Sequence, residues 1–364
     1  MTGIYIHIPF CERKCPYCAF YSVVPDRDVK EKYLQRIIKD ISGIDRTVKA
    51  DTLYFGGGTP LLLGADGIAQ IVDQCGRAFE LISPEITVEC NPNSTDKEAL
   101  KILKSAGVDR LSVGVQSLDD GELRLLGRLH NSSQAIQTLQ DANSVGFNNV
   151  SADLMIGIKG QTEERITSSV KTLKELGAKH ISVYMIKVEQ GTAFDTPSIR
   201  SRLTDDDETS QLYLATVNSC KAFGFEQYEI SNFAVPGYES KHNLKYWRGE
   251  EYIGLGPSAH SFYKGVRSCW PSSLTDYLKD SEQIITDNSP DKAEEYVMLG
   301  LRLSKGIDFD IAAKLGIDGH KIDNAVKLAV KLQKNGLCML DGNRMSLTPE
   351  GMLVSNSIIG AILA

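Results

Sequence analysis

The first half of the chain alternates between short apolar runs and longer stretches with helical spacing, and this rhythm limits the fold more than any other feature. Such alternation predicts right-handed βαβ units around a parallel sheet, in an α/β domain. This pattern does not distinguish an open sheet from a barrel. In both folds, ligands bind at the carboxyl ends of the strands. The expected strands are 3–8, 51–55, 85–90, 110–115, 149–158 and 180–186, and the expected helices are 28–41, 66–79, one capped by Ser94 or Thr95 and ending at 105, 119–126, 132–145 and 162–176.

The rhythm changes near residue 200. The acidic run LTDDDETS predicts a capped helix that ends at Phe223, and an irregular segment rich in Gly, Tyr and Asn covers 224–270. Residues 291–360 look mainly helical, with a hairpin at Asp341-Gly342. We therefore expect a small α-rich, winged-helix-like domain at the end of the chain.

Composition narrows the class of protein. A 42% apolar and 24% charged chain is typical of a soluble globular protein, and a net charge of −7 argues against nucleic acid as a partner. No apolar run of about 18 residues predicts a membrane span, which leaves peripheral membrane contact open. The opening MTGIYIHIPF lacks the features of a signal peptide, so the simplest expectation is a cytoplasmic protein.

Three of the eight cysteines crowd into one motif, CERKCPYC, directly after the first expected strand. Cys11, Cys15 and Cys18 are thiols of the kind that bind soft metals and iron–sulfur clusters. Three ligands would leave one iron of a four-iron cluster open to another molecule. A zinc site completed by a distant histidine, or three unliganded thiols, are the alternatives. The five scattered cysteines are expected to be small buried hydrophobes.

The longer segment YIHIPFCERKCPYC resembles the radical S-adenosylmethionine (SAM) signature of the HemN/HemW branch. This resemblance implies a partial (β/α)6 TIM barrel and a 4Fe-4S cluster on the three cysteines. It also implies SAM, whose amino and carboxylate groups would chelate the unique iron and which would yield a 5′-deoxyadenosyl radical on reduction. The implied domains are a radical SAM core (1–235), a connecting segment (236–285) and a HemN-like α-rich domain (286–364).

A glycine triplet, Gly56-Gly57-Gly58, follows the second expected strand. It is not a phosphate-binding Walker A loop, because no Gly-Lys-Ser/Thr follows, and a lone triplet is more often a tight turn. The resemblance assigns it to SAM instead, with Glu89 on the ribose and Arg128 on the methionyl carboxylate. The full set of implied SAM residues is Tyr5, Tyr17, Gly57, Gly58, Thr59, Glu89, Gln116, Arg128 and Asp153.

A third motif, HNLKYW, places His242, Asn243, Tyr246 and Trp247 together. Histidine is a common axial ligand of haem iron, and aromatic rings pack on a porphyrin. An isolated histidine beside a tryptophan is otherwise a hydrogen-bonded core residue. The pattern HNxxYW resembles HemW-type haem chaperones, which implies haem binding, with His242 as the candidate ligand and His260 as the next. A haem-acceptor protein would then be a partner.

Two departures separate the chain from coproporphyrinogen-oxidising HemN enzymes. Phe20 stands where those enzymes carry a further cysteine, and only ten residues precede Cys11. Ala19, Cys90 and Lys159 also differ from common HemW-like residues, while the cysteine triad is intact. Three functions remain: a haem chaperone, a radical SAM enzyme acting on a tetrapyrrole such as an oxygen-independent coproporphyrinogen III oxidase, and a zinc-stabilised binding protein. No residue is assigned to catalysis.

Overall fold

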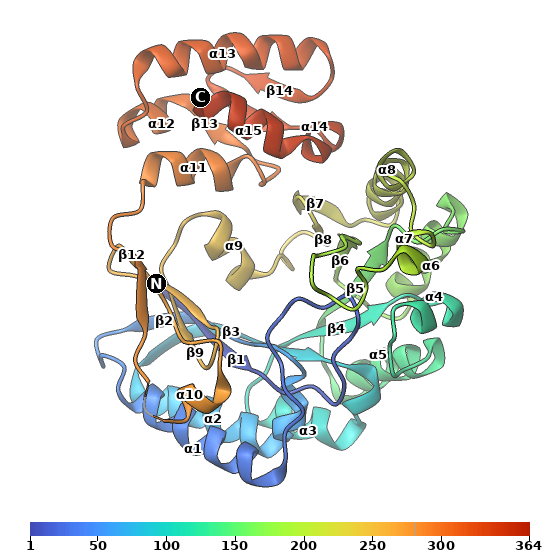
Figure 1. Cartoon of the computed structure of the whole chain (residues 1–364), viewed down its shortest axis with the longest axis vertical. Helices are drawn as coiled ribbons and strands as arrows, with labels where there is room; N and C mark the ends of the chain where they lie inside the picture. Colours follow the sequence, from blue (N-terminus) through green and yellow to red (C-terminus); the bar gives the residue numbers. More distant parts are fainter. Residues whose placement is uncertain (280) are drawn as a thin grey trace.

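The computed structural model describes residues 1–279 and 281–364, which form a strongly curved sheet wrapped by helices and a smaller helical domain beside it (Figure 1). Six parallel strands lie side by side in chain order. This arrangement confirms the expected partial barrel of α/β class. The strands are β1 (Thr2–Ile8), β2 (Lys49–Gly57), β3 (Glu80–Cys90), β4 (Arg110–Gln116), β5 (Asn149–Ile156) and β6 (His180–Met185).

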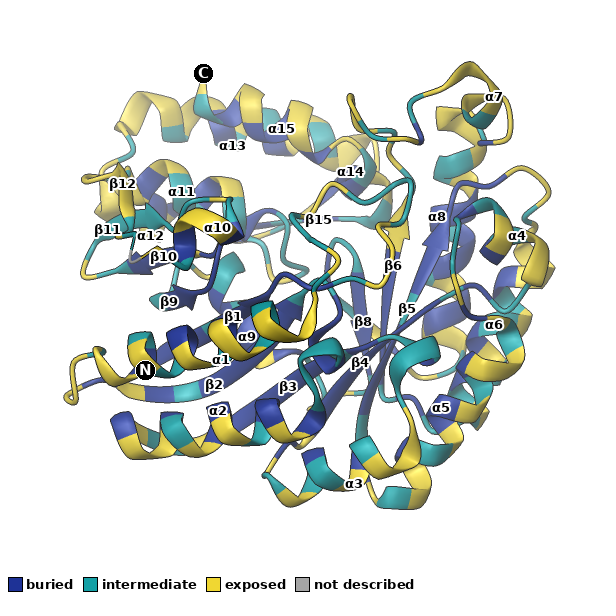
Figure 2. Ribbon diagram, turned by 60° about the horizontal axis from the view of Figure 1, so that its bottom comes forward, coloured by how far each residue is buried: buried dark blue, intermediate teal, exposed yellow. Residues whose placement is uncertain are grey.

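Helices cover the outer face of this sheet (Figure 2). Most begin at a polar cap: Asp26, Asn131 and Asp205 each accept a hydrogen bond from a backbone N–H in the first turn. The helices are α1 (Arg27–Ser42), α2 (Ala65–Ala78), α3 (Lys97–Ser105), α4 (Asp120–Leu125), α5 (Ser132–Val145), α6 (Glu163–Glu175), α7 (Pro197–Arg200) and α8 (Asp206–Ala222), with short 3-10 turns at Pro60–Leu63 and Pro92–Ser94.

The segment expected to be irregular, 224–270, is the main correction to the sequence analysis. It contains short strands that extend both edges of the main sheet, because existing edges supply the backbone partners that runs of three or four residues need. The elements from here to the end of the sheet are β7 (Glu226–Glu229), β8 (Asn232–Ala234), α9 (Lys241–Trp247), β9 (Tyr252–Leu255), β10 (His260–Tyr263), β11 (Val266–Cys269), α10 (Leu274–Tyr277) and β12 (Ile284–Asp287).

Two smaller expectations are also corrected. The cap of α3 is Asp96, which accepts from the N–H of Ala99, whereas Ser94 and Thr95 turn back toward the carbonyl of Asn91. Four of the scattered cysteines are buried, but Cys269 on β11 is only half-buried.

The C-terminal domain has its own apolar core and a three-stranded sheet of order β13-β15-β14. Its hairpin turns at Gly342, as expected from the sequence, with a positive φ of 57° that favours glycine. The elements are α11 (Lys292–Gly300), β13 (Ile307–Asp308), α12 (Phe309–Leu315), α13 (Gly319–Lys334), β14 (Cys338–Asp341), β15 (Arg344–Leu347), α14 (Pro349–Leu353) and α15 (Ser355–Leu363). No described helix has the length and apolar character to cross a bilayer.

The two faces of the parallel sheet differ in chemistry. The outward positions Ile6, Phe55 and Val88 pair in register and are fully buried under the helices. The inward positions carry polar side chains, among them Thr52, Arg110 and Ser151, which are also buried. The apolar layer therefore holds the barrel together, and the polar layer lines its interior.

We expect Phe55→Ala to lower the free energy of unfolding by about 3–5 kcal/mol, because it leaves a large cavity in the apolar layer. Urea unfolding followed by circular dichroism measures this change. The control is Val24→Ala at a side chain that is 72% exposed, for which we expect a change within about 0.5 kcal/mol. Equal effects of the two substitutions would contradict the assignment of the core.

Candidate functional site

A cavity of about 510 Å³ opens at the carboxyl ends of β1 to β6. Parallel strands bring their ends to one edge, so residues far apart in sequence meet there. Several side chains that the sequence analysis singled out line it together. These are Tyr17, Cys18, Gly57, Gly58, Thr59, Glu89, Gln116, Arg128 and Asp153.

The cysteine loop between β1 and α1 is pinned at several points. The N–H of Cys11 donates to the carbonyl of Val23 at 2.9 Å, and the N–H of Cys18 donates to the carbonyl of Cys15 at 3.0 Å. Arg13 donates to the carbonyl of Gly127 at 2.8 Å. The loop is therefore held against both the barrel and the turn that follows α4.

All three thiols of this loop are half-buried and free of disulfides. Burial raises the pKa of the Cys18 thiol, with Cys15 and Cys11 adding to the shift. Among the described residues, no three His, Cys, Asp or Glu side chains converge on one point as ligands of a single ion do. A 4Fe-4S cluster asks for a different arrangement, because each thiolate binds a different iron. Three free thiols in one restrained loop fit that donor set.

Arg128 connects the cysteine loop to the cavity. Its Nη1 lies 3.6 Å from Cys15 Sγ and 3.4 Å from the hydroxyl of Tyr17. Its Nη2 donates to the carbonyl of Gly114 at 3.1 Å and also to Asn91 Oδ1. A half-buried guanidinium beside the thiols provides positive charge where a cluster and a carboxylate would both gain from it.

Glu89 projects into the cavity from β3. Tyr54 donates to its Oε1 at 2.9 Å, and the N–H of Gly57 donates to its Oε2 at 3.3 Å. Burial raises the pKa of Glu89 to about 7, although the hydrogen bond from Tyr54 opposes that shift. A Cβ added at Gly56 would lie only 3.0 Å from Oε1, so glycine leaves room for the carboxylate.

The glycine triplet also joins the β2 end to the cysteine loop. The N–H of Thr59 donates to the carbonyl of Phe10 at 2.6 Å, and a Cβ at Gly58 would lie 2.4 Å from that oxygen. Such a contact is closer than any side chain tolerates. Gly58 is therefore required for the close approach of the two loops.

Asp153 and Gln116 complete the inner wall of the cavity. Burial raises the pKa of Asp153, which accepts from Ser112 at 3.3 Å. Gln116 ends β4 with a φ of 65°, a left-handed conformation that is uncommon outside glycine. The sequence analysis assigned no role to Asn91 or Tyr54. Asn91 directly follows a strand, which is a signal that the sequence carries, whereas the pairing of Tyr54 with Tyr5 is visible only in the structure.

Tyr5 lies one layer below the cavity and does not line it. Its hydroxyl is 3.1 Å from His7 Nδ1, and its ring is tilted against that of Tyr54 with centroids 6.1 Å apart. Its expected contact with SAM stays a prediction. In the structure the Tyr5 ring packs against the Tyr54 ring.

The HNLKYW motif forms α9, which lies on the inner side of the barrel. His242 is 1% exposed, with Nδ1 2.8 Å from the hydroxyl of Thr52 and Nε2 2.8 Å from that of Tyr246. Neither ring nitrogen is free to bind iron in this conformation. Asn243 and Trp247 are half-buried, and the guanidinium of Arg302 lies 5.7 Å from the Trp247 ring. His242 therefore does not line the cavity.

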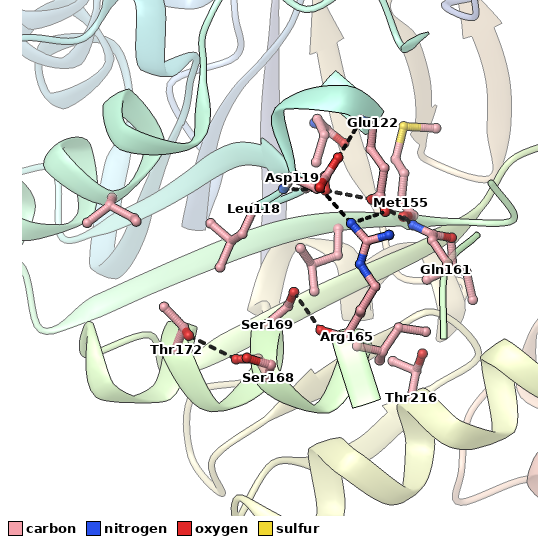
Figure 3. Close-up of a pocket in the computed structure, with 16 residues that line it drawn as sticks. Leu118, Asp119, Glu122, Met155, Gln161, Arg165, Ser168, Ser169, Thr172 and Thr216 are labelled. Atoms are coloured by element: carbon pink, nitrogen blue, oxygen red, sulfur yellow. Dashed lines mark hydrogen bonds and ion pairs between the residues drawn. The ribbon is translucent and has the colours of Figure 1, made fainter. Parts of the chain in front are cut away.

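A second cavity, of about 380 Å³, adjoins the first and shares Gln116 and Met155 with it. Figure 3 shows its charged groups turned toward one another. Arg165 contacts Asp119 at 2.6 Å, and the amide of Gln161 donates to Glu122 at 3.0 Å. Gln161 also accepts from the N–H groups of 157 and 158. This network braces the ends of β4 and β5 from outside.

Family models match most of the chain. Residues 5–173 match the radical SAM superfamily, and residues 288–354 match the HemN C-terminal domain. Among solved structures, the chain is similar to coproporphyrinogen III oxidase (HemN) from Escherichia coli, with a TM-score of 0.80 at 20% identity over 99% of this chain and 89% of the other. That likeness shows a common fold.

Curated relatives cover the chain from end to end. Haem chaperone HemW of Bacillus subtilis is 35% identical over 100% of this chain and 99% of its own length. HemW of Mycobacterium tuberculosis (strain H37Rv) is 32% identical over 99% and 94%, and the mitochondrial radical S-adenosyl methionine domain-containing protein 1 of Bos taurus is 31% identical over 100% and 87%. The motifs, the barrel and these similarities agree: the chain belongs to the HemW haem-chaperone family of the radical SAM superfamily.

Proposed function

We propose that this protein is a haem chaperone that carries a 4Fe-4S cluster on Cys11, Cys15 and Cys18, binds SAM in the adjoining cavity, and delivers haem to an acceptor protein. The observation that supports the proposal best is Arg128, which contacts Cys15 on one side and lines the cavity on the other. One charged group thus serves the cluster loop and the cofactor pocket together.

Different residues of the cavity would bind different parts of SAM. The Arg128 guanidinium would pair with the methionyl carboxylate, and Glu89 would accept from the ribose hydroxyls. The glycine loop lets the backbone approach the amino-acid part closely. When bound, the cluster and SAM supply one-electron chemistry at a sulfonium.

The haem part of the proposal is supported by the names of the relatives, which are haem chaperones. The iron ligand stays a prediction. His242 is enclosed by its hydrogen-bond partners, whereas His260, the second candidate, is exposed at the start of β10. Phe20, at the position of the further cysteine of HemN enzymes, is 68% exposed on the cavity rim, where it offers an apolar surface and no thiol.

The test is anaerobic reconstitution with iron and sulfide, followed by a haem titration in the Soret region with and without SAM. We expect saturable haem binding on top of an intact cluster, with no conversion of an added porphyrinogen. Cluster formation without haem binding, together with porphyrinogen turnover, would instead support an enzyme acting on a tetrapyrrole.

We expect Cys15→Ser to lose the cluster, because a hydroxyl replaces a thiolate poorly on iron. Iron and acid-labile sulfide content after reconstitution measure the loss. Cys269→Ser is the matched control, since Cys269 lies on β11 in the sheet extension and not in the cysteine loop, and it should keep wild-type content. Full iron and sulfide in Cys15→Ser would disprove the ligand assignment.

Through Glu89 alone, we expect SAM to bind more weakly at pH 6 than at pH 8, by at most about tenfold, because its pKa of about 7 leaves mostly the protonated acid at the lower pH. The protonated form loses one acceptor for the ribose hydroxyls. Isothermal titration of SAM across this range, for wild type and Glu89→Gln, measures the effect. SAM's own titration is common to both proteins, so the difference between the two profiles belongs to Glu89; parallel profiles would contradict the prediction.

A further inference from the structure

The ring of His242 is neutral and is held in place inside the barrel by contacts at both nitrogens. Thr52 on β2 contacts one nitrogen and Tyr246 on α9 contacts the other, both at 2.8 Å. Burial, with smaller contributions from the charges of Lys245 and Arg110, lowers the pKa of His242 to about 3. A neutral imidazole donates through one nitrogen and accepts through the other, so both hydroxyl contacts can be satisfied at once.

Two tyrosine rings lie along the faces of this imidazole. The Tyr54 ring is stacked on it at 5.1 Å with an interplanar angle of 27°, and the Tyr5 ring at 6.2 Å with 29°. Tyr54 then donates to Glu89 Oε1 at 2.9 Å. A continuous path of contacts therefore leads from His242 through one ring to the carboxylate in the cavity.

The helix that carries His242 is itself anchored to the sheet. Lys245 is 4% exposed and its Nζ contacts Asp51 at 2.8 Å and the carbonyl of Met1 at 3.0 Å. At the start of the helix, the N–H of Lys241 donates to Glu85 on β3 at 2.9 Å. A helix tied to β2, to β3 and to the residue before β1 places its imidazole reproducibly against Tyr54.

We propose that His242 is a positioning residue of the SAM pocket and not an iron ligand: its ring holds the Tyr54 ring in place, and Tyr54 holds the Glu89 carboxylate toward the ribose. The inference rests on the proposed function, because it takes SAM to bind beside Glu89. His242 thereby acts on the cofactor pocket through Tyr54, without lining the pocket itself.

This role and axial ligation differ in which substitution can replace histidine. Glutamine carries a donor and an acceptor on one planar amide, so it can bond to both Thr52 and Tyr246. Alanine can do neither and leaves both hydroxyls without their partner. A positioning residue is therefore partly rescued by His242→Gln, whereas an imidazole ligand of iron is lost in both variants.

The experiment compares wild type, His242→Ala, His242→Gln, Tyr54→Phe and the His242→Ala/Tyr54→Phe double variant, each reconstituted with its cluster. Titration calorimetry gives the Kd of SAM, and Soret absorption with electron paramagnetic resonance reports the ligands of bound haem iron. The matched control is His320→Ala, which removes an exposed histidine from α13 in the C-terminal domain.

We expect His242→Ala and Tyr54→Phe each to raise the Kd of SAM about tenfold, the cost of a hydrogen bond to a charged group. The double variant should resemble either single one, because both act through the same bond to Glu89. His242→Gln should restore most of the affinity, and the haem spectra should match those of wild type and His320→Ala.

A changed iron spectrum in both His242 variants with an unaltered Kd for SAM would overturn this inference and leave the proposed function standing. A wild-type Kd in Tyr54→Phe would also overturn it, whether or not His242→Ala folds. A wild-type protein that forms its cluster but does not bind SAM would overturn the inference and the proposed function together.

Discussion

The in-register parallel pairing of β1 to β6 is the constraint on which the site depends. Pairing of Tyr5 with Tyr54, and of Glu89 with Ser112, sets which side chains face inward and at what height. A slip of one residue in a strand would send its inward side chains to the helix-covered face. Because the strands run the same way, the loops that follow them meet at one edge, where the thiols, the glycine triplet and Arg128 meet.

That arrangement leaves polar and charged side chains buried inside the barrel, which costs free energy. Arg110 is 1% exposed, and burial opposes its charge, but Glu85 and neighbouring groups keep the pKa of the guanidinium above its ordinary value. For Glu85, burial outweighs the attraction of Arg110 and raises the pKa. Removing either partner would leave a buried charge uncompensated, which is costly. The apolar outer layer under the helices must therefore supply most of the stability.

Strand and helix order could be predicted from the sequence, because strong periodicity carries that information, and the cysteine triad stood out by its spacing. Nine of the residues that line the cavity were implied by the family resemblance of the motifs at the strand ends. The strands within 224–270 could not, since three- or four-residue runs gain order only from an existing sheet edge. The burial of His242 was foreseen only as an alternative. Its two hydroxyl partners lie on β2 and on α9 itself, and the contact with Thr52 across 190 positions leaves no trace in local sequence.

Helix α9 has one side in the barrel and another beside the C-terminal domain, where Trp247 meets Arg302. Two ligands that bind on opposite sides of one shared element obey thermodynamic reciprocity: whatever factor the first imposes on the affinity of the second, the second imposes on the first. A molecule that engages the C-terminal domain and, by shifting α9, changes the affinity of the barrel pocket would have its own affinity changed by an equal factor when that pocket is occupied. Helix α9 is thus the element through which binding in one domain and binding in the other can be linked.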